Sequence, residues 1–97
     1  MRIKNSEDNI INTAALLKAI GHPIRVQIIL VLSQKSYMTV TELSETLEID
    51  QPVMSLHLAI LRKQNVIAVK KYGKTSKYSM LDVSVRQIVS IVYYSRG

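Results

Sequence analysis

The spacing of apolar residues predicts three helices in the first half of the chain. The first has a start signal at Ser6, which is followed by two acids, and ends at Gly21; its apolar positions are Ile10, Ile11, Ala14, Leu17 and Ile20. A second helix over residues 23–35, opened by Pro23, is apolar on most sides, as expected of a buried central helix. A third, short helix over residues 40–47 has a capping box at its start, and its buried face is expected to consist of Val40, Leu43 and Leu47.

A fourth helix is expected over residues 51–64, after a tight turn at residues 48–50. Asp50 can cap this helix, and Asn65 can end it in the left-handed conformation. Its inner stripe at i, i+4 and i+7 consists of Met54, Leu58 and Leu61. Residues 36–38, between the second and third helices, are predicted to be an irregular connection.

A β-hairpin and a last helix complete the pattern. Strands are expected at residues 66–72 and 76–81, with Gly73 in the turn, where it is free to take a positive φ. The last helix opens at Asp82 or Ser84, and apolar side chains cover most of its surface: Val85, Ile88, Val89, Ile91, Val92 and Tyr93.

The predicted order is therefore four helices, two strands and one helix in a single domain spanning residues 1–97. Two short helices joined by a three-residue turn, the second polar on its outside, are typical of a helix-turn-helix. The hairpin directly after them makes this a winged helix-turn-helix. The fold class is mostly α with a small antiparallel β-hairpin.

The composition narrows the class of protein. Phe, Trp and Cys are all absent from the 97 residues. An aliphatic core is therefore expected, and disulfides, thiolate metal ligands and thiol redox switches are excluded. The longest apolar run, residues 28–32, is far shorter than the roughly 20 residues of a membrane span, and the N-terminus lacks the apolar core of a signal peptide. We expect a cytoplasmic protein without a membrane partner.

The net charge of +6 lies entirely in residues 51–81, which contain six basic residues and no acid. The remaining basic and acidic residues balance. Charge runs usually do no more than solvate a surface, but this one has a single sign and falls on a helix followed by a hairpin. That placement predicts contact with a polyanion, and double-stranded DNA is the favoured one.

Several segments carry a resemblance to a known family. They are residues 19–25 (AIGHPIR), residues 51–61 (QPVMSLHLAIL), Val66-Ile67, residues 70–74 (KKYGK) and residues 78–80 (YSM). Together they resemble the ArsR/SmtB family of bacterial repressors, whose pattern is roughly L-x-x-P-x-R, then Q-x-x-V-S-x-H-L-x-x-L, an apolar strand start, a basic wing with Gly, and Y-x-L. The resemblance covers about residues 10–95 in the right order.

The resemblance implies a homodimeric winged-helix repressor that binds an imperfect palindrome in promoter DNA and is released by an effector, often a metal ion. It places Gln51, Val53, Ser55 and Leu56 at base-facing positions of the recognition helix. Because apolar groups can touch thymine methyls, Val53 and Leu56 predict T-rich half-sites. The basic side chains expected to contact DNA from this helix and from the wing at residues 66–81 are Arg62, Lys63, Lys70, Lys71, Lys74 and Lys77.

The metal-binding positions of the family are changed in this chain. Residues 39–43 (TVTEL) stand where thiolate-type members carry Cys-Val-Cys-Asp-Leu, and hydroxyls are poor ligands for soft metals. Asp82 matches the start of the last-helix site, but Ser84 and Ser95 stand where histidines would be needed. We predict no metal site and no cofactor, and the effector stays unidentified. His22 and His57, the two histidines, are expected to form structural hydrogen bonds.

The first and last helices are too apolar to lie exposed on a monomer, so a homodimer related by a two-fold axis is expected. The expected interface consists of Ile10, Ile11, Ala14, Leu17, Val85, Ile88, Val89, Val92 and Tyr93. Such a dimer would place two recognition helices about 34 Å apart, one turn of DNA. Tyr93 and Tyr94 could line an effector pocket instead of packing at this interface.

Two other functions remain open, and an enzyme is not predicted. The chain could be a protein-interaction module that needs a different partner, or a nonspecific architectural DNA binder. Ser55 has no base and acid arranged beside it, and the sequence contains no Gly-rich phosphate loop and no paired-acid site. No catalytic residue is therefore expected.

Overall fold

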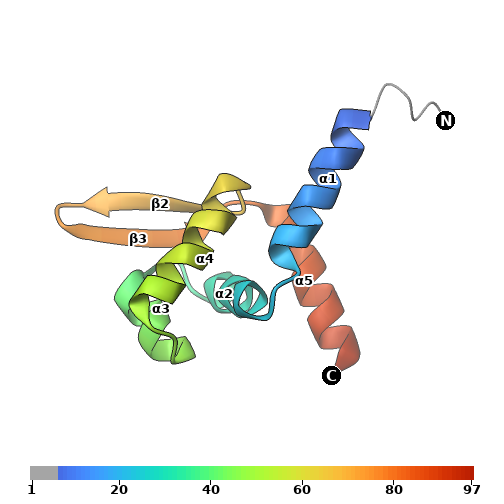
Figure 1. The fold of residues 1–97 in the computed structure, drawn as a ribbon. Helices are drawn as coiled ribbons and strands as arrows, with labels where there is room; N and C mark the ends of the chain where they lie inside the picture. The colour runs from blue at the N-terminus through green and yellow to red at the C-terminus, as the bar shows by residue number, and fades with distance from the viewer. Residues whose placement is uncertain (1–6) are drawn as a thin grey trace.

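The computed structural model describes residues 7–97 and is mostly helical, with a small antiparallel sheet (Figure 1). The elements in chain order are α1 (Glu7–Ile20), α2 (Pro23–Gln34), β1 (Met38–Thr39), α3 (Val40–Leu47), α4 (Gln51–Lys63), β2 (Ile67–Tyr72), β3 (Thr75–Met80) and α5 (Val83–Arg96). Over these residues the sheet has three strands in the order β1-β3-β2. The expected helix start at Ser6 lies outside the described residues.

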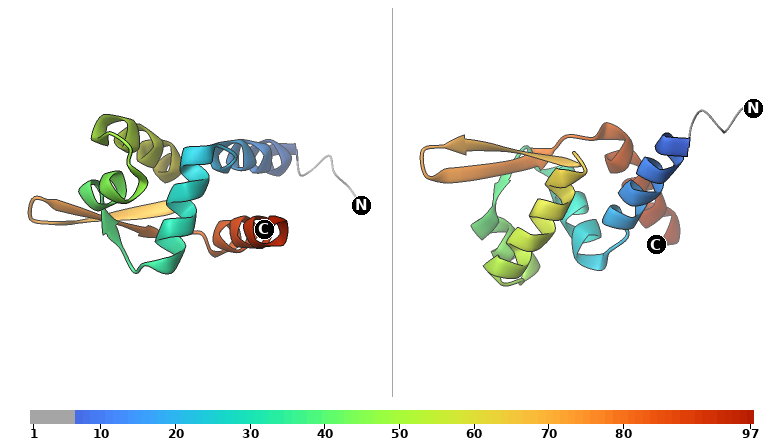
Figure 2. Two further views of the ribbon diagram at one scale, coloured as in Figure 1. Left: turned by 90° about the horizontal axis from the view of Figure 1, so that it is seen from below. Right: turned by 45° about the horizontal axis from the view of Figure 1, so that its top comes forward.

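The elements divide the molecule into two ends around α2. The β2–β3 hairpin extends from one end, beside α3 and α4, and α1 and α5 extend from the other (Figures 1 and 2). The described chain is correspondingly elongated, with extents of 48 × 34 × 22 Å. The predicted helix-turn-helix and wing therefore lie apart from the terminal helices.

Capping groups fix where several helices begin. Thr39 and Glu42 form both hydrogen bonds of a capping box at α3, as the sequence predicts. Asp82 accepts from the backbone N–H of Val85 and caps α5. His22 caps α2, because its Nδ1 accepts from the backbone N–H of Ile24 at 3.1 Å. Local polar contacts thus set three helix starts around the core.

Asp50 is the N-cap residue of α4, but its side chain makes no capping hydrogen bond to the described chain. An N-cap side chain usually accepts from the second or third residue of the helix. Here the second residue is Pro52, which has no N–H to give. The third residue, Val53, has an N–H, but the side chain of Asp50 does not accept from it. The expected side-chain cap at Asp50 was therefore wrong.

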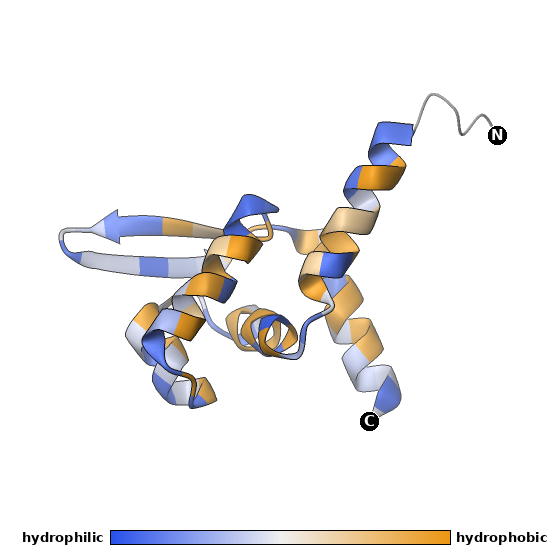
Figure 3. Cartoon of the chain, in the orientation of Figure 1, coloured by the Kyte–Doolittle hydropathy of each residue, from blue (hydrophilic) through white to orange (hydrophobic). Residues whose placement is uncertain are grey.

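The core forms where α2, α4, α5 and the base of the hairpin meet. Its most completely buried side chains are aliphatic or Met: Ile28, Ile29, Leu32, Leu43, Met54, Leu58, Leu61, Val66 and Val85. Figure 3 shows apolar segments along α2, α4 and α5, and mostly hydrophilic colouring along the outer part of the hairpin. The inner stripe predicted for α4, at Met54, Leu58 and Leu61, is confirmed.

The structure corrects the expected connection at residues 36–38. Met38 and Thr39 form β1 and pair with Tyr78 and Lys77 of β3. A two-residue strand has no periodicity of its own, so only the nonlocal pairing reveals it. The hairpin strands and α4 also end slightly differently from the prediction: Val66 and Leu81 lie outside the strands, and Gln64 is the C-cap of α4.

Candidate nucleic-acid interface

The turn between α3 and α4 is held by backbone hydrogen bonds. Glu48 has φ 55° and ψ 48°, the left-handed conformation, and its N–H donates to the carbonyl of Ser44. The N–H of Ile49 donates to the same carbonyl at 3.0 Å. This conformation costs a non-glycine residue about 1 kcal/mol. The turn fixes how α4 leaves α3.

The predicted base-facing residues all lie on the exposed side of α4. Val53 is 41% exposed and Leu56 is 61% exposed, which is high for apolar side chains in a small protein. Gln51 and Ser55 are exposed too, and the Gln51 amide donates to the hydroxyl of Thr41 at 3.1 Å. This hydrogen bond from the Gln51 side chain to Thr41 of α3 fixes the orientation of Gln51.

Sequence reasoning missed Ala59 as part of this surface. It is exposed three residues after Leu56 and four before Lys63, so the three share one face of α4. Because its side chain is small, a partner can approach the helix backbone closely there. The i, i+3, i+7 spacing could have revealed it.

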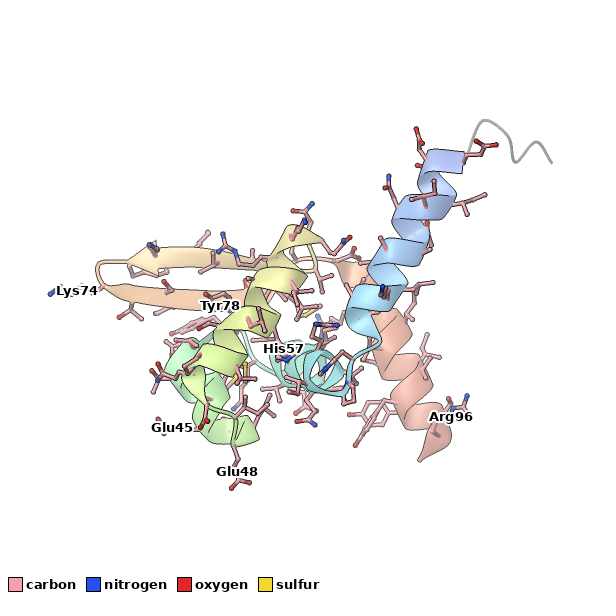
Figure 4. All side chains as sticks on the ribbon, viewed as in Figure 1. Glu45, Glu48, His57, Lys74, Tyr78 and Arg96 are labelled. Atoms are coloured by element: carbon pink, nitrogen blue, oxygen red, sulfur yellow. The ribbon has the colours of Figure 1, made fainter. Side chains whose placement is uncertain are left out.

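The wing places basic side chains along β2, its turn and β3. The strands pair Lys70 with Lys77 and Lys71 with Ser76, so Lys70 and Lys71 point to opposite faces. Gly73 takes φ +63° in the turn, as predicted, and Lys74 lies at the tip (Figure 4). Lys70, Lys71 and Lys74 are exposed, whereas Lys77 is half-buried.

A group of acidic side chains lies beside the basic surface. The positive net charge of the whole chain does not reveal this group. Glu42, Glu45, Glu48 and Asp50 all lie on α3 and the turn after it. Figure 4 shows Glu45 and Glu48 beside α3, away from the wing tip at Lys74. The pKa of the Glu42 carboxyl is lowered, chiefly because the backbone N–H of Thr39 donates to it. The helix-turn-helix is therefore anionic on its first helix and cationic on its wing.

His57 joins the recognition helix to the rest of the core. Its Nδ1 lies 3.2 Å from a guanidinium nitrogen of Arg25, and its ring centroid lies 4.6 Å from that of His22. Because a guanidinium can only donate, this nitrogen of His57 accepts and the ring is neutral. Burial, followed by the charges of His22 and Arg25, lowers the pKa of His57. The expected structural hydrogen bonds of both histidines are confirmed.

The terminal helices expose apolar side chains at the end away from the wing. Ile10, Ile11, Leu17, Ile88, Val92 and Tyr93 are each at least 45% exposed, and Ala14 is exposed beside them. A groove of about 780 Å³ runs between α5 and the junction of α1 with α2; Tyr93 and Tyr94 are among its lining residues, and Arg96 is the charged one. This surface is unusually apolar for an exposed one.

Two residues expected at that interface are instead buried in the core of their own chain. Val85 is 1% exposed and Val89 is 6% exposed, because both pack into the core of their own chain. They lie on the side of α5 that faces the core. Helical spacing had marked α5 as apolar nearly all round and did not separate its core side from its exposed side.

Comparison with known proteins decides the family. The family described as bacterial regulatory protein, arsR family, matches residues 22–69, from the residue before α2 into β2. A helix-turn-helix transcriptional regulator of Methanocaldococcus jannaschii is 33% identical over 79 residues, covering 81% of this chain and 89% of that protein. The chain belongs to the ArsR family. Its members are transcriptional regulators with a DNA-binding helix-turn-helix, not enzymes.

Solved structures of similar proteins confirm the winged helix-turn-helix fold of this ArsR-family chain. The transcriptional activator HlyU of Vibrio cholerae is 30% identical over 93 residues, covering 96% of this chain and 85% of HlyU. The structure of reduced HlyU has a TM-score of 0.82 and covers 94% of this chain and 95% of its own. A winged helix-turn-helix DNA-binding domain of Mycobacterium bovis, only 17% identical, shares the fold with a TM-score of 0.85 and covers 99% of this chain and 88% of its own.

The metal sites that the ArsR resemblance suggests do not fit the residues present. In the α3 capping box the hydroxyl of Thr39 accepts from the backbone N–H of Glu42, and the carboxylate of Glu42 accepts from the backbone N–H of Thr39. Asp82 caps α5. Among residues 7–97, no three His, Cys, Asp or Glu side chains gather closely enough to hold a metal ion.

Within residues 7–97, no single helix is long and apolar enough to cross a membrane. One bent pair, α1 with α2, meets the length and composition requirements together, with an angle of 87° between the two helices.

Proposed function

We propose that this ArsR-family protein is a homodimeric repressor that binds an imperfect palindrome in promoter DNA. The observation that carries the proposal is the division of the molecule into two ends. One end has an exposed recognition helix beside a basic wing, and the other has exposed apolar helices. A two-fold pairing at the apolar end would leave both recognition helices free for successive turns of one DNA face.

The recognition helix α4 is proposed to read bases. Gln51 and Ser55 supply hydrogen-bonding groups, and Val53 and Leu56 supply apolar contacts for thymine methyls. The exposure of all four side chains supports this role, as does the orientation of Gln51 by Thr41. The preferred sequence would then be selected more by apolar contacts with the methyl groups of A·T pairs than by hydrogen bonds to base edges.

The exposed basic side chains are proposed to contact the DNA backbone. Arg62 and Lys63 lie in the last turn of α4, and Lys70, Lys71 and Lys74 lie exposed on the wing. Lys77, also expected from the sequence to contact DNA, is half-buried on β3. Each phosphate neutralised releases counterions, so affinity should fall steeply as salt concentration rises. Phosphate contacts would position the protein on the DNA and α4 would recognise the bases, so the two contribute separately to affinity and to sequence preference.

The dimer is proposed to form through α1 and α5, in a single domain that spans residues 1–97. Its interface consists of Ile10, Ile11, Ala14, Leu17, Ile88, Val92 and Tyr93, without the two core valines. Covering these side chains removes a large apolar surface from water, and that burial favours association. The groove between α5 and the α1–α2 junction lies in the same region and would be narrowed by a second copy.

Repression is proposed to occur because the dimer covers promoter DNA and blocks polymerase. Release would need an effector that binds the free dimer more tightly than the DNA-bound dimer. An effector with equal affinity for both would not change the equilibrium between the free and the DNA-bound protein.

The test is selection of bound sites from random duplex DNA with the purified protein at physiological salt, alongside sedimentation to measure its mass. A palindromic motif with half-sites about ten base pairs apart and a dimer mass would support the proposal. Salt-sensitive binding without a motif would identify an architectural binder instead. A monomer that does not bind DNA would favour a module that needs a different partner. Reporter transcription that falls on deletion of the gene would identify an activator, as HlyU is named.

A further inference from the structure

Lys77 is in a different environment from the other lysines of the wing. Its Nζ lies 4.1 Å from the ring centroid of Tyr37 and 4.9 Å from that of Tyr72. Both distances are within the range of about 6 Å over which an ammonium is attracted to an aromatic face. Lys77 is half-buried, and Lys70, Lys71 and Lys74 are exposed. Its charge is therefore already engaged within the protein.

The two rings come from different parts of the fold. Tyr72 ends β2 inside the wing, and Tyr37 precedes β1, two residues before the N-cap of α3. Thr39 of β1 is the pairing partner of Lys77, so alternation along the strands brings Tyr37, Tyr72 and Lys77 to one face of the sheet. The ammonium thus joins the wing to the segment that begins the helix-turn-helix.

The charges around Lys77 favour this position. Lys70 lies directly opposite it on β2, and like charges paired in this way repel. Glu42 in the first turn of α3 carries the opposite charge, and Lys77 is one of the groups that lower the pKa of that carboxyl. Repulsion from Lys70 and attraction to Glu42 both favour a position of the ammonium away from Lys70 and toward Tyr37 and α3.

We propose that Lys77 is a positioning residue, whose ammonium between the rings of Tyr37 and Tyr72 holds the wing against the start of α3. Lys70, Lys71 and Lys74 then contact the phosphates. The inference rests on the proposed DNA binding only for its functional consequence. A wing held in place before binding loses less conformational freedom on DNA, and this raises affinity without adding a phosphate contact.

A hollow of about 210 Å³ beside the ammonium supplies the competing explanation. Its lining includes Lys70 and Lys77 together with Tyr37 and Tyr72. If a phosphate enters this hollow, Lys77 binds phosphate like the others. The two roles differ in how binding depends on salt, because only a lysine that neutralises a phosphate releases counterions.

The first experiment compares Lys77→Met with Lys74→Met by titrating DNA at several salt concentrations. Lys74→Met should lower the slope of log K against log salt by about 0.9 for each phosphate that the protein no longer neutralises. Lys77→Met should weaken binding about threefold to tenfold while the slope stays that of the unchanged protein. An equal fall of the slope in both variants would overturn the proposal and place a phosphate at Lys77.

The second experiment needs no DNA, so it tests the position of the Lys77 ammonium between the two tyrosine rings separately from the proposed function. Aromatic ring currents should shift the ε-methylene protons of Lys77 upfield of those of Lys74 in the NMR spectrum. Tyr37→Leu should reduce this shift to the contribution of Tyr72, whereas Tyr37→Phe, which keeps the ring, should retain it. A Lys77 signal that coincides with that of Lys74 in the unchanged protein would overturn the proposed position of Lys77 between the rings. Failure to bind DNA while the shift persists would count against the proposed function alone.

The tyrosine variants also test the consequence for binding. Tyr37→Leu retains all the lysines, so it should weaken DNA binding about threefold to fivefold with an unchanged salt slope. Tyr37→Phe should bind like the unchanged protein. Equal binding by the Leu and Phe variants would show that the ring does not position the wing.

Discussion

Two leucines on α4 offer a matched test of the recognition helix. Leu56 and Leu58 are two residues apart on the same helix, but Leu56 is 61% exposed and Leu58 is 1% exposed. We predict that Leu56→Ala weakens DNA binding and leaves the fold intact, whereas Leu58→Ala destabilises the fold. The same leucine-to-alanine change at the two positions therefore separates an effect on DNA affinity from an effect on the stability of the fold.

The magnitudes follow from the two environments. Leu58→Ala leaves a cavity in the core and should cost about 2–5 kcal/mol, a large part of the roughly 5–15 kcal/mol that stabilises a small domain. Leu56→Ala should change stability by no more than about 0.5 kcal/mol. Burial of three carbons is worth at most about 2.4 kcal/mol, and partial contact with a thymine methyl gives about 1–2 kcal/mol, or roughly a 5- to 30-fold loss of affinity.

The assay combines urea denaturation with fluorescence anisotropy on the selected operator. A second operator carries deoxyuridine in place of thymidine at the positions facing α4, which removes only the methyl groups. If Leu56 contacts those methyls, the loss from Leu56→Ala should shrink on the uracil operator, with a coupling above about 0.5 kcal/mol. An equal loss on both operators would refute thymine-methyl recognition by Leu56.

Three further predictions concern stability. Asp82→Ala should lower the free energy of unfolding by about 1 kcal/mol in thermal melts, because α5 loses its N-cap, and Asp82→Asn should restore most of it. Glu48→Gly should raise stability by about 1 kcal/mol, since glycine adopts the left-handed turn freely, whereas Glu45→Gly inside α3 should lower it by a similar amount; a loss in both variants would contradict this account of the turn. The lowered pKa of His57 means that the unfolded chain takes up its proton first, at the ordinary value near 6.5. Stability should therefore fall as the pH drops below that value, with a weaker dependence in His57→Gln; an unchanged pH dependence in urea titrations would argue against His57 as the group responsible.

Local signals in the sequence predicted most of the fold. The capping box at Thr39 and Glu42, the positive φ of Asn65 and Gly73, and the inner stripe of α4 all appear as expected. Each depends on residues within a few positions of one another, so the sequence alone contains the necessary information. The side chain of Asp50 was the exception, because it makes no capping hydrogen bond although its position and residue type suit one.

Nonlocal pairing accounts for what the sequence did not show. β1 exists because Met38 and Thr39 pair with β3, far away in the chain, and the same pairing brings Tyr37 to Lys77. Likewise, Val85 is buried because α5 packs on α2 and not on a partner. A pattern of apolar residues identifies a buried side but does not say which surface buries it.

The distribution of charge decides how the proposed complex is oriented. Summed along the chain, the residues outside 51–81 are neutral, yet four of their acids lie together on α3 and its turn: Glu42, Glu45, Glu48 and Asp50. At physiological salt, charges act over about 8 Å, so phosphates respond to the nearest group and not to the net charge. Phosphates near α3 are repelled, and those near Lys70, Lys71 and Lys74 are attracted. The DNA backbone should therefore follow the wing and the last turn of α4, leaving the exposed uncharged side chains of α4 to meet the bases: Gln51, Val53, Ser55 and Leu56.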